Sequence, residues 1–335
     1  MNNSCETGFM EEAPVDVASE KSDFRKTIYK LAVFGALCVF NKLFLIYIFI
    51  YPYGLIAKGL DKSAGFEAAY LLGWIVNELC VYFFPILAAY FLFKTDFKKR
   101  GGYKSRYEFH PVFTMPVIFL SSIFAGSLAT IITNAVADVF DSWFGTGEIP
   151  DAMEGTMPPE GEAGGLAIAM IFLVITAPVC EELLVRGILL TALRKHGEWF
   201  GIIVSALVFG FIHGNLDQLP YAFVVGILYG LLAVRSGSVI PSMILHSVNN
   251  LLVVLGSYLT QITGEIEPAV SLQRWVGICL NLFFWIGILA TVTLFAAKLH
   301  KLPGGILSSK DKARELIRNP GIYIFGLSLA ALMIT

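Results

Sequence analysis

The chain has 335 residues, of which 56% are hydrophobic and 15% are charged, and its formal net charge is −2. Soluble globular domains carry about 25% charged residues, so this composition excludes a water-soluble enzyme and a disordered protein. The near-neutral charge gives no basic surface for DNA or RNA, so no nucleic-acid partner is expected. We therefore expect an all-α polytopic membrane protein that has the lipid bilayer as its surroundings.

Residues 1–29 form a polar tail of mixed charge that lacks the apolar core of a signal peptide, and we expect it to be cytoplasmic. A helix needs about 20 mostly apolar residues to cross a bilayer. The sequence predicts a bundle of about eight transmembrane helices, near 31–56, 66–94, 112–137, 164–193, 199–214, 218–234, 238–259 and 274–298. The fifth and sixth stretches are short, which favours helices surrounded by protein. The apolar tail 322–334 is shorter still, and it either lies in the membrane interface or begins a further span.

Basic residues gather in alternate connections between these stretches. They occupy the loop 95–106, the turn 194–195, Arg235 and the segment 298–314. The C-terminal part 300–335 is expected to consist of a basic segment and a short apolar tail. The opposite connection, 138–163, contains several Asp and Glu and no Lys or Arg. Because positive charge stays on the cytoplasmic side, the sequence predicts a cytoplasmic N-terminus and an external acidic loop.

The five cysteines do not predict a disulfide framework. Their number is odd and no CxxC motif occurs, so a zinc knuckle is not expected either. Four of them lie inside apolar runs, where a free cysteine behaves as a small hydrophobic residue.

Ionisable residues at membrane depth are costly and usually mark function. The fourth stretch contains Glu181, Glu182 and Arg186. Glu182 and Arg186 are four residues apart, so they share a helix face and can pair. Glu181 is rotated by about 100° from Glu182 and must face something else. Pro178 removes a backbone hydrogen bond just upstream and can bend the helix. An ion pair that only fixes helix packing is the alternative, but it leaves Glu181 unexplained.

Two histidines lie inside later stretches, His213 in the fifth and His246 in the seventh, and Asn250 follows His246 by one helical turn. A single membrane histidine is ordinarily an interhelical hydrogen-bonding residue. Two histidines, an unpaired Glu and an Asn at comparable depth in adjacent helices indicate a functional site rather than helix packing alone. Glu181 and His213 each lie roughly 20 Å from the cytoplasmic ends of their helices, and His246 lies nearer, at roughly 12–15 Å. A helix that bends at Pro178 or starts late can close this gap. The group is therefore expected to converge on one cavity.

Peptide hydrolysis needs a base that activates water and donors for the oxyanion. Glu181 with His213 can deprotonate water, while His246 and Asn250 can donate hydrogen bonds. Glu181, His213 and His246 are also a set that can hold zinc, with water as the fourth ligand, and the residues alone leave both mechanisms open. The sequence lacks the HExxH motif of zinc metalloproteases, the GxSG motif of rhomboid-type proteases and the GxGD motif of presenilin-type proteases. If the chain is an intramembrane protease, we therefore expect one that uses Glu and His.

The three motifs EExxxR (181–186), FxxxH (209–213) and HxxxN (246–250) occur on successive hydrophobic segments. In this order they resemble the CAAX protease and bacteriocin-processing (CPBP, or ABI) family of intramembrane proteases, which includes the type II CAAX prenyl endopeptidase. The resemblance covers about residues 164–259. It implies a helical bundle around a water-filled cavity, with Glu181 and His213 activating water and with His246 and Asn250 as oxyanion donors. Glu182, Arg186 and Phe209 complete the motifs as supporting residues.

The resemblance further implies a transmembrane protease domain over 30–299 with its catalytic core at 164–259, in a bacterial cell membrane. Its substrate would be a membrane-associated peptide or protein, including lipidated peptides and bacteriocin precursors. The family is described both as a metalloprotease family and as metal-free; we favour the metal-free mechanism, because no third strong ligand is evident. Two other interpretations stay open. One is a non-catalytic immunity or scaffold protein of the same fold, and the other is a transporter with Lys42, Glu78 and Asn281 lining its path.

Overall fold

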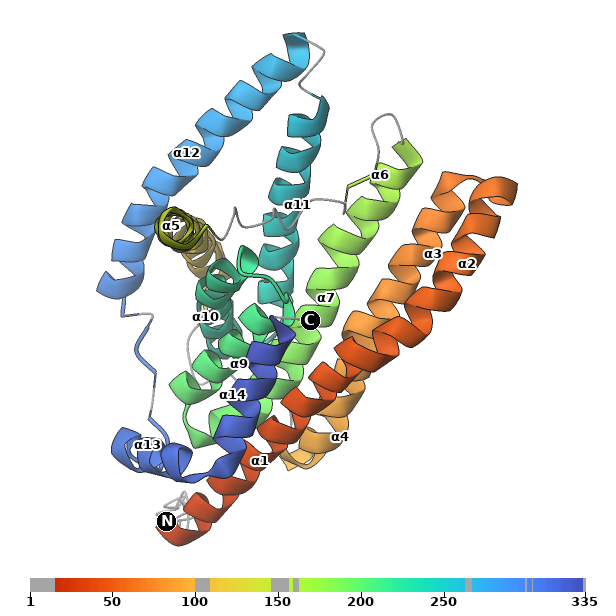
Figure 1. The fold of residues 1–335 in the computed structure, drawn as a ribbon. Helices are drawn as coiled ribbons and strands as arrows, with labels where there is room; N and C mark the ends of the chain where they lie inside the picture. Colours follow the sequence, from red (N-terminus) through yellow and green to blue (C-terminus); the bar gives the residue numbers. More distant parts are fainter. Residues whose placement is uncertain are drawn as a thin grey trace, which may run out of the picture.

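The computed structural model describes residues 16–99, 109–145, 157–158, 163–262, 267–298, 300–302 and 304–333, and these contain helices but no strand. Figure 1 shows the helices running side by side as a bundle. Within the described residues, seven helices are long and apolar enough to cross a membrane: Val17–Phe44, Phe66–Lys94, Pro111–Phe144, Ala163–His196, Gln218–Ser236, Ile240–Leu259 and Gly277–Ala296. The chain is an all-α polytopic membrane protein, as the composition predicts.

The α-helices are α1 (Val17–Phe40), α2 (Ile46–Ala64), α3 (Phe66–Glu78), α4 (Phe84–Lys99), α5 (Pro111–Phe144), α6 (Ala163–Ala169), α7 (Ala177–Glu182), α8 (Thr191–Leu193), α9 (Glu198–Ile212), α10 (Gln218–Ser236), α11 (Ile240–Ile262), α12 (Glu267–Ala296), α13 (Ser309–Arg318) and α14 (Pro320–Leu332). Four π-helical segments continue the helices they adjoin: η1 (Asn41–Leu45), η2 (Leu79–Phe83), η3 (Met170–Thr176) and η4 (Leu183–Leu190). A 3₁₀ turn, η5 (Arg194–His196), closes the fourth span.

The first helix begins at Val17, earlier than the predicted stretch 31–56 and inside the segment expected to be a polar tail. The side chain of Asp16 caps it by accepting a hydrogen bond from the backbone N–H of Ala18, at 3.0 Å. Although this region is polar overall, Phe24, Ile28 and Leu31 recur on one face and are buried, so packing extends the helix toward the N-terminus. Residues 1–15 lie outside the described part of the chain.

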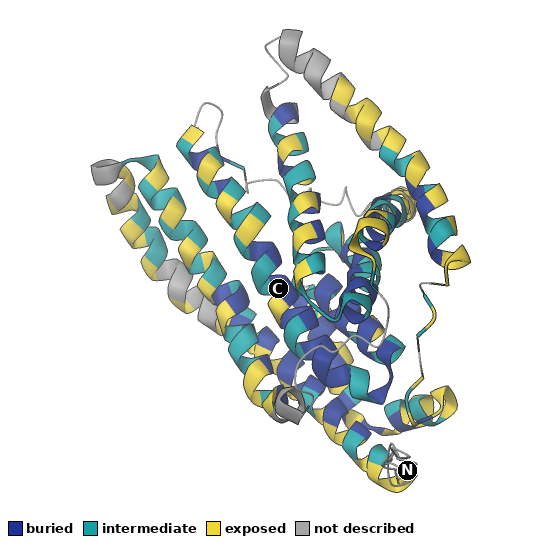
Figure 2. Cartoon of the chain, turned by 180° about the vertical axis from the view of Figure 1, so that it is seen from behind, coloured by how far each residue is buried: buried dark blue, intermediate teal, exposed yellow. Residues whose placement is uncertain are grey.

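The two short stretches behave differently. Helix α9 has 15 residues, too few to cross a bilayer, and most of its inward face is buried. Helix α10 has 19 residues and is long enough to span, with half of its apolar window buried. Figure 2 shows that the deeply buried residues gather in the centre of the bundle while the outer helices expose much of their surface. The expectation of a protein-surrounded helix therefore holds for α9, whereas α10 also qualifies as a span.

Close packing of α9 against α10 positions one motif residue. A Cβ atom on Gly226 of α10 would lie 3.1 Å from both the Cβ of Ala206 and the Cδ1 of Phe209. Small residues let neighbouring membrane helices approach in this way. The absence of a side chain at Gly226 therefore brings the backbone of α10 against the ring of Phe209.

The C-terminal helix α14 packs against α1 and α9, and at 13 residues it is too short to span. The topology prediction rests on the charges of two loops that lie largely outside the described residues. These are the basic loop, of which 100–108 is not described, and the acidic loop, of which 146–156 and 159–162 are not described.

Candidate active site

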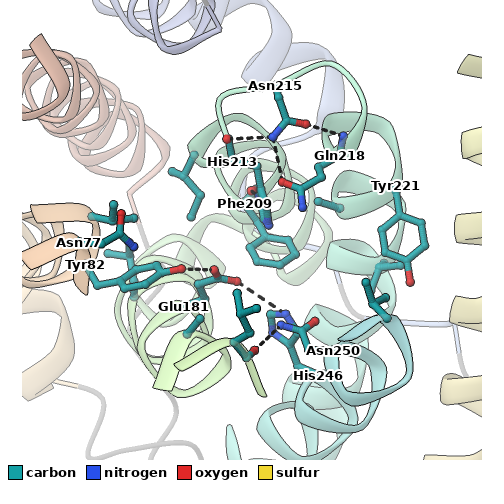
Figure 3. Close-up of a pocket in the computed structure, with 18 of the residues that line it drawn as sticks. Asn77, Tyr82, Glu181, Phe209, His213, Asn215, Gln218, Tyr221, His246 and Asn250 are labelled. Carbon is teal, nitrogen blue, oxygen red and sulfur yellow. Dashed lines mark hydrogen bonds and ion pairs between the residues drawn. The ribbon is translucent and has the colours of Figure 1, made fainter. Parts of the chain in front are cut away.

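A cavity of about 690 Å³ opens inside the bundle, and Glu181, His213, His246 and Asn250 all line it. Figure 3 shows these side chains converging from three parts of the bundle around the ring of Phe209. Glu181 comes from α7, His213 follows α9, and the other two come from α11. The predicted convergence of the polar residues on one cavity is thus confirmed. The volume lies within the range of ordinary ligand pockets.

The two glutamates lie where the helix geometry changes. They end α7, a short α-helical stretch between the π-helical segments η3 and η4. Pro178 is the second residue of α7, which follows η3 without a break, so its missing N–H leaves a carbonyl of the preceding turn without that helical hydrogen bond. π-Helical turns inside α-helices occur frequently at functional sites. The local backbone thus sets the directions in which Glu181 and Glu182 point.

Glu182 and Arg186 form the predicted ion pair, with Nη1 of Arg186 donating to Oε1 of Glu182 at 2.7 Å and both side chains fully buried. Nη2 of Arg186 donates to the backbone oxygen of Gly226 at 3.0 Å. The guanidinium also lies over the ring of Phe209, 4.5 Å from its centroid. Arg186 therefore ties the fourth span to α9 and α10, and its charge is compensated at a depth where an isolated charge would be costly.

Glu181 faces the cavity instead of Arg186, as its position in the helix predicts. Its Oε1 accepts a hydrogen bond from the hydroxyl of Tyr82 at 2.6 Å. Its Oε2 lies 3.6 Å from Nε2 of His246, which is too long for a hydrogen bond. Oε2 is buried and has no hydrogen-bond partner among the described residues. A buried carboxylate oxygen of this kind calls for a bound water or ligand to satisfy it.

His246 connects the two glutamates. Its Nδ1 lies 3.2 Å from Oε1 of Glu182, and its Nε2 faces Glu181. A carboxylate can only accept a hydrogen bond, so Nδ1 carries a proton in this arrangement. Hydrogen bonds thus run from Arg186 through Glu182 to His246, and they hold the imidazole ring in a defined orientation at the cavity wall.

His213 is held by a contact to its own helix. Its Nδ1 lies 2.7 Å from the backbone oxygen of Phe209, so Nδ1 is the donor and, in the neutral ring, Nε2 is left as an acceptor. The ring of Phe209 meets His213 and His246 edge-on, at centroid distances of 5.0 and 5.5 Å. Phe209 thus separates the two imidazoles and orients both, while no ion pair joins His213 to Glu181 in the structure.

Asn250 is anchored to the fourth span. Its Nδ2 donates to the backbone oxygen of Leu173 in η3 at 2.9 Å. A side-chain amide nitrogen carries two hydrogens, so one remains for a group in the cavity. The neighbouring Asn249 has a different contact, since its Oδ1 accepts from the hydroxyl of Tyr221 at 2.7 Å.

Tyr82 is the site residue that the sequence interpretation missed. A weak signal exists, because Glu78 and Tyr82 are one helical turn apart inside the second span. Both line the cavity. The two carboxylate oxygens of Glu78 are buried and have no hydrogen-bond partner among the described residues. The tyrosine hydroxyl reaches Glu181 only because η2 and α7 lie on facing sides of the cavity, and a single sequence does not contain that contact.

The residues of the transporter interpretation do not form a common path. Lys42 lines the cavity and donates to the backbone oxygen of Leu332 at 2.7 Å, rather than to Glu78. Asn281 is exposed on α12, where its Oδ1 accepts from the indole of Trp285 at 2.9 Å, and it is not among the residues that line the cavity.

Glu181, His213 and His246 do not have the spacing of a zinc site. Ligand atoms about 2.0–2.2 Å from one ion must lie within a little over 4 Å of one another. In the part of the chain that the structure describes, a group whose ligand atoms all lie within 4.8 Å of each other is formed by Glu20, Asp23 and His196, outside the cavity. The three cavity residues do not form such a group, so the arrangement does not fit a zinc ion.

Comparisons with known proteins agree with the motifs. Residues 163–252 match the family model described as "Type II CAAX prenyl endopeptidase Rce1-like". A protein of Escherichia coli, "Uncharacterized 24.3 kDa protein", is 32% identical over 85 residues, which are 24% of this chain and 39% of that protein. The chain thus spans about two fifths of the length of that relative. No solved structure matches. The resemblance to the CAAX protease family is thus confirmed over residues 163–252.

Proposed function

We propose that this chain, whose residues 163–252 match the CAAX-type protease family, is an intramembrane endopeptidase that hydrolyses a peptide bond with water activated by Glu181. One observation carries the proposal. Oε2 of Glu181 is a buried carboxylate oxygen without a hydrogen-bond partner among the described residues, and it borders a cavity that two histidines and an asparagine also line.

In the first step, Glu181 takes a proton from a water molecule that is also hydrogen-bonded to Nε2 of His213. The resulting hydroxide attacks the scissile carbonyl carbon, and the carbonyl oxygen becomes an oxyanion. His246, with both nitrogens protonated, and the second amide hydrogen of Asn250 donate to this oxygen. General-base catalysis typically contributes about 10²–10⁴-fold to a rate, and loss of one oxyanion donor costs about 10²–10³-fold.

In the second step, the tetrahedral intermediate collapses and the C–N bond breaks. Glu181 returns its proton to the leaving amine, so the carboxylate is regenerated and the products are a carboxylic acid and an amine. Tyr82 positions the carboxylate through its hydrogen bond to Oε1. Arg186 and Glu182 act indirectly, by holding His246.

The substrate is a membrane-associated peptide or protein, including lipidated ones, and the protein resides in a bacterial cell membrane. A cavity of about 690 Å³ admits a short extended segment rather than a folded domain. A helical substrate must unwind locally, because each helical carbonyl is already engaged in a backbone hydrogen bond. Glycine or proline near the cleaved bond should therefore accelerate cleavage.

Cleavage should not depend on a metal ion. Purified chain reconstituted in liposomes with membrane-anchored peptides, after dialysis against excess chelator, should give the same products and rate as untreated protein, as measured by mass spectrometry. Elemental analysis of the active protein should find well under one zinc per chain. Reversible loss of activity on chelation, together with stoichiometric zinc that disappears in the His213→Ala and His246→Ala variants, would contradict the metal-free mechanism.

The cavity should lie toward the cytoplasmic side, with the N-terminus also cytoplasmic. In a cysteine-free background, Lys104→Cys should react with an impermeant thiol reagent only from the cytoplasmic side. Glu154→Cys, in the acidic loop, should react only from outside. The positive-inside rule gives this expectation. The reverse labelling pattern would place the site on the external side.

A further inference from the structure

Helix α13 (Ser309–Arg318) is a short amphipathic helix outside the cavity, and it connects the long apolar helix α12 with α14. In Figure 1 it lies across the end of the bundle, near the start of α1. Ser308 caps it, because its Oγ accepts from the backbone N–H of Asp311 at 3.1 Å. The helix is therefore a defined element at the end of a membrane span.

The acidic residues of α13 face the protein. Asp311 lies 3.4 Å from Nζ of Lys21, and Glu315 accepts from Nε of Arg25 at 2.6 Å, both on α1. Glu315 is buried, and the hydrogen bond from Arg25 lowers the pKa of its carboxyl group, so it stays ionised. The negative charges of the helix are thus compensated by α1.

The solvent-exposed face of α13 is cationic and borders the two acidic residues. Lys310, Arg314 and Arg318 are exposed at successive i, i+4 positions. None of the three forms an ion pair within the described residues. Like charges at this spacing repel one another, so an anionic group bound at this face would relieve their repulsion. Beside them, Ile317 is 68% exposed, which adds an apolar side chain to the same surface.

We propose that this face, formed by Lys310, Arg314, Ile317 and Arg318, binds the phosphate headgroups of anionic phospholipids. The helix follows the membrane span Gly277–Ala296 through the connection 297–308 and pairs with Lys21 and Arg25 at the polar start of α1, so it lies at the level where headgroups are found. Basic residues combined with exposed apolar side chains are typical of helices at a membrane surface, and clustered Lys and Arg are attracted to anionic lipids. The apolar Ile317, and the location at the end of a span, favour lipid over a soluble acidic protein.

Such binding would also fix α14. Asn319 joins the two helices and donates through Nδ2 to the backbone oxygen of Arg25 at 3.3 Å. At the other end of α14, the backbone oxygen of Leu332 accepts from Lys42 at the cavity wall. A lipid held by α13 would therefore restrain a helix that borders the cavity.

Native mass spectrometry of the full chain tests this proposal. The protein, in an uncharged detergent, receives equal amounts of phosphatidylglycerol and phosphatidylcholine. The wild type should retain phosphatidylglycerol preferentially. The triple variant K310S/R314S/R318S should lose about tenfold or more of this preference, since each cation near an anionic surface contributes to binding. The matched control K310R/R314K/R318K, which preserves the charges, should retain it.

An unchanged preference for phosphatidylglycerol in a folded triple variant would overturn the proposal. If thermal unfolding shows that the triple variant is misfolded, the single variant R314E replaces it. An unchanged preference for phosphatidylglycerol in R314E would then overturn the proposal. Binding of a poly-glutamate peptide, with the same dependence on the three cations but without binding of phosphatidylglycerol, would assign the surface to an acidic protein instead. Proteolysis enters none of these readouts, so the outcome is independent of the proposed enzymatic function.

Discussion

Replacing Glu181 with glutamine is expected to lower the rate of peptide cleavage by about 10²–10⁴-fold, while the protein remains folded. Glutamine preserves the size of the side chain and can still accept the hydrogen bond that Tyr82 donates at 2.6 Å. It cannot accept a proton from water. The measurement compares cleavage rates of purified wild type and E181Q in liposomes, with thermal unfolding as the check on folding.

The variant Y82F serves as a graded control for E181Q. It removes one donor to the carboxylate of Glu181 but leaves the base itself in place, so its rate should fall far less than that of E181Q. Near-normal cleavage by purified E181Q, or a loss in Y82F as large as in E181Q, would contradict the assignment of Glu181 as the base.

Replacing Glu182 with glutamine should destabilise the protein as well as inactivate it. Arg186 is fully buried and pairs with Glu182 at 2.7 Å, and breaking one side of a buried ion pair costs about 3–5 kcal/mol. The same carboxylate contacts Nδ1 of His246 at 3.2 Å; a neutral amide oxygen accepts this hydrogen bond more weakly than a carboxylate does, so the ring is held less firmly. Thermal unfolding in detergent should show the lower stability, and the remaining folded protein should cleave slowly.

The Arg194–Glu198 pair provides the matched control for E182Q. It has the same i, i+4 spacing and a distance of 2.8 Å, and its side chains are about one tenth exposed. Neither residue lines the cavity. The variant E198Q should therefore lower stability while folded protein keeps its cleavage rate. A stable and fully active E182Q would contradict the role of the Arg186–Glu182–His246 chain.

Much of the candidate site could be predicted from local sequence spacing. The Glu182–Arg186 pair follows from i, i+4 geometry. Glu181 precedes Glu182 by one residue and therefore points about 100° away from that pair. Depth estimates from helix rise put Glu181 and His213 at one level, but they put His246 nearer the cytoplasmic end, so its place at the same cavity depended on how the helices bend. The catalytic roles of these residues stay predictions.

The contacts between helices could not be predicted in the same way. The position of His246 between two glutamates, and the hydrogen bond of Tyr82 to Glu181, depend on how each helix is rotated against its neighbours. Packing sets this rotation, for example through the close approach of α10 at Gly226, and no local pattern encodes it. The π-helical segments around Glu181 and Glu182 likewise have no sequence signature that the spacing of polar residues reveals.

The helix boundaries could likewise be predicted only in part from the local sequence. Hydrophobic length predicted the membrane spans, yet the helix that begins at Val17 was expected to start near residue 31. Its first turns are polar on average, and their stability comes from Phe24 and Ile28 being buried against other helices. A length-based count cannot recognise a span whose end is amphipathic.

The most direct test of the central claim compares the membrane peptides of cells that carry the wild-type chain with those of cells that carry E181Q at equal levels. Mass spectrometry of peptide termini should reveal at least one membrane-associated peptide or protein that accumulates uncut with E181Q, together with its matching cleavage product in the wild type. Identical sets of termini in the two cell types would contradict the proposal that Glu181 activates water for intramembrane proteolysis.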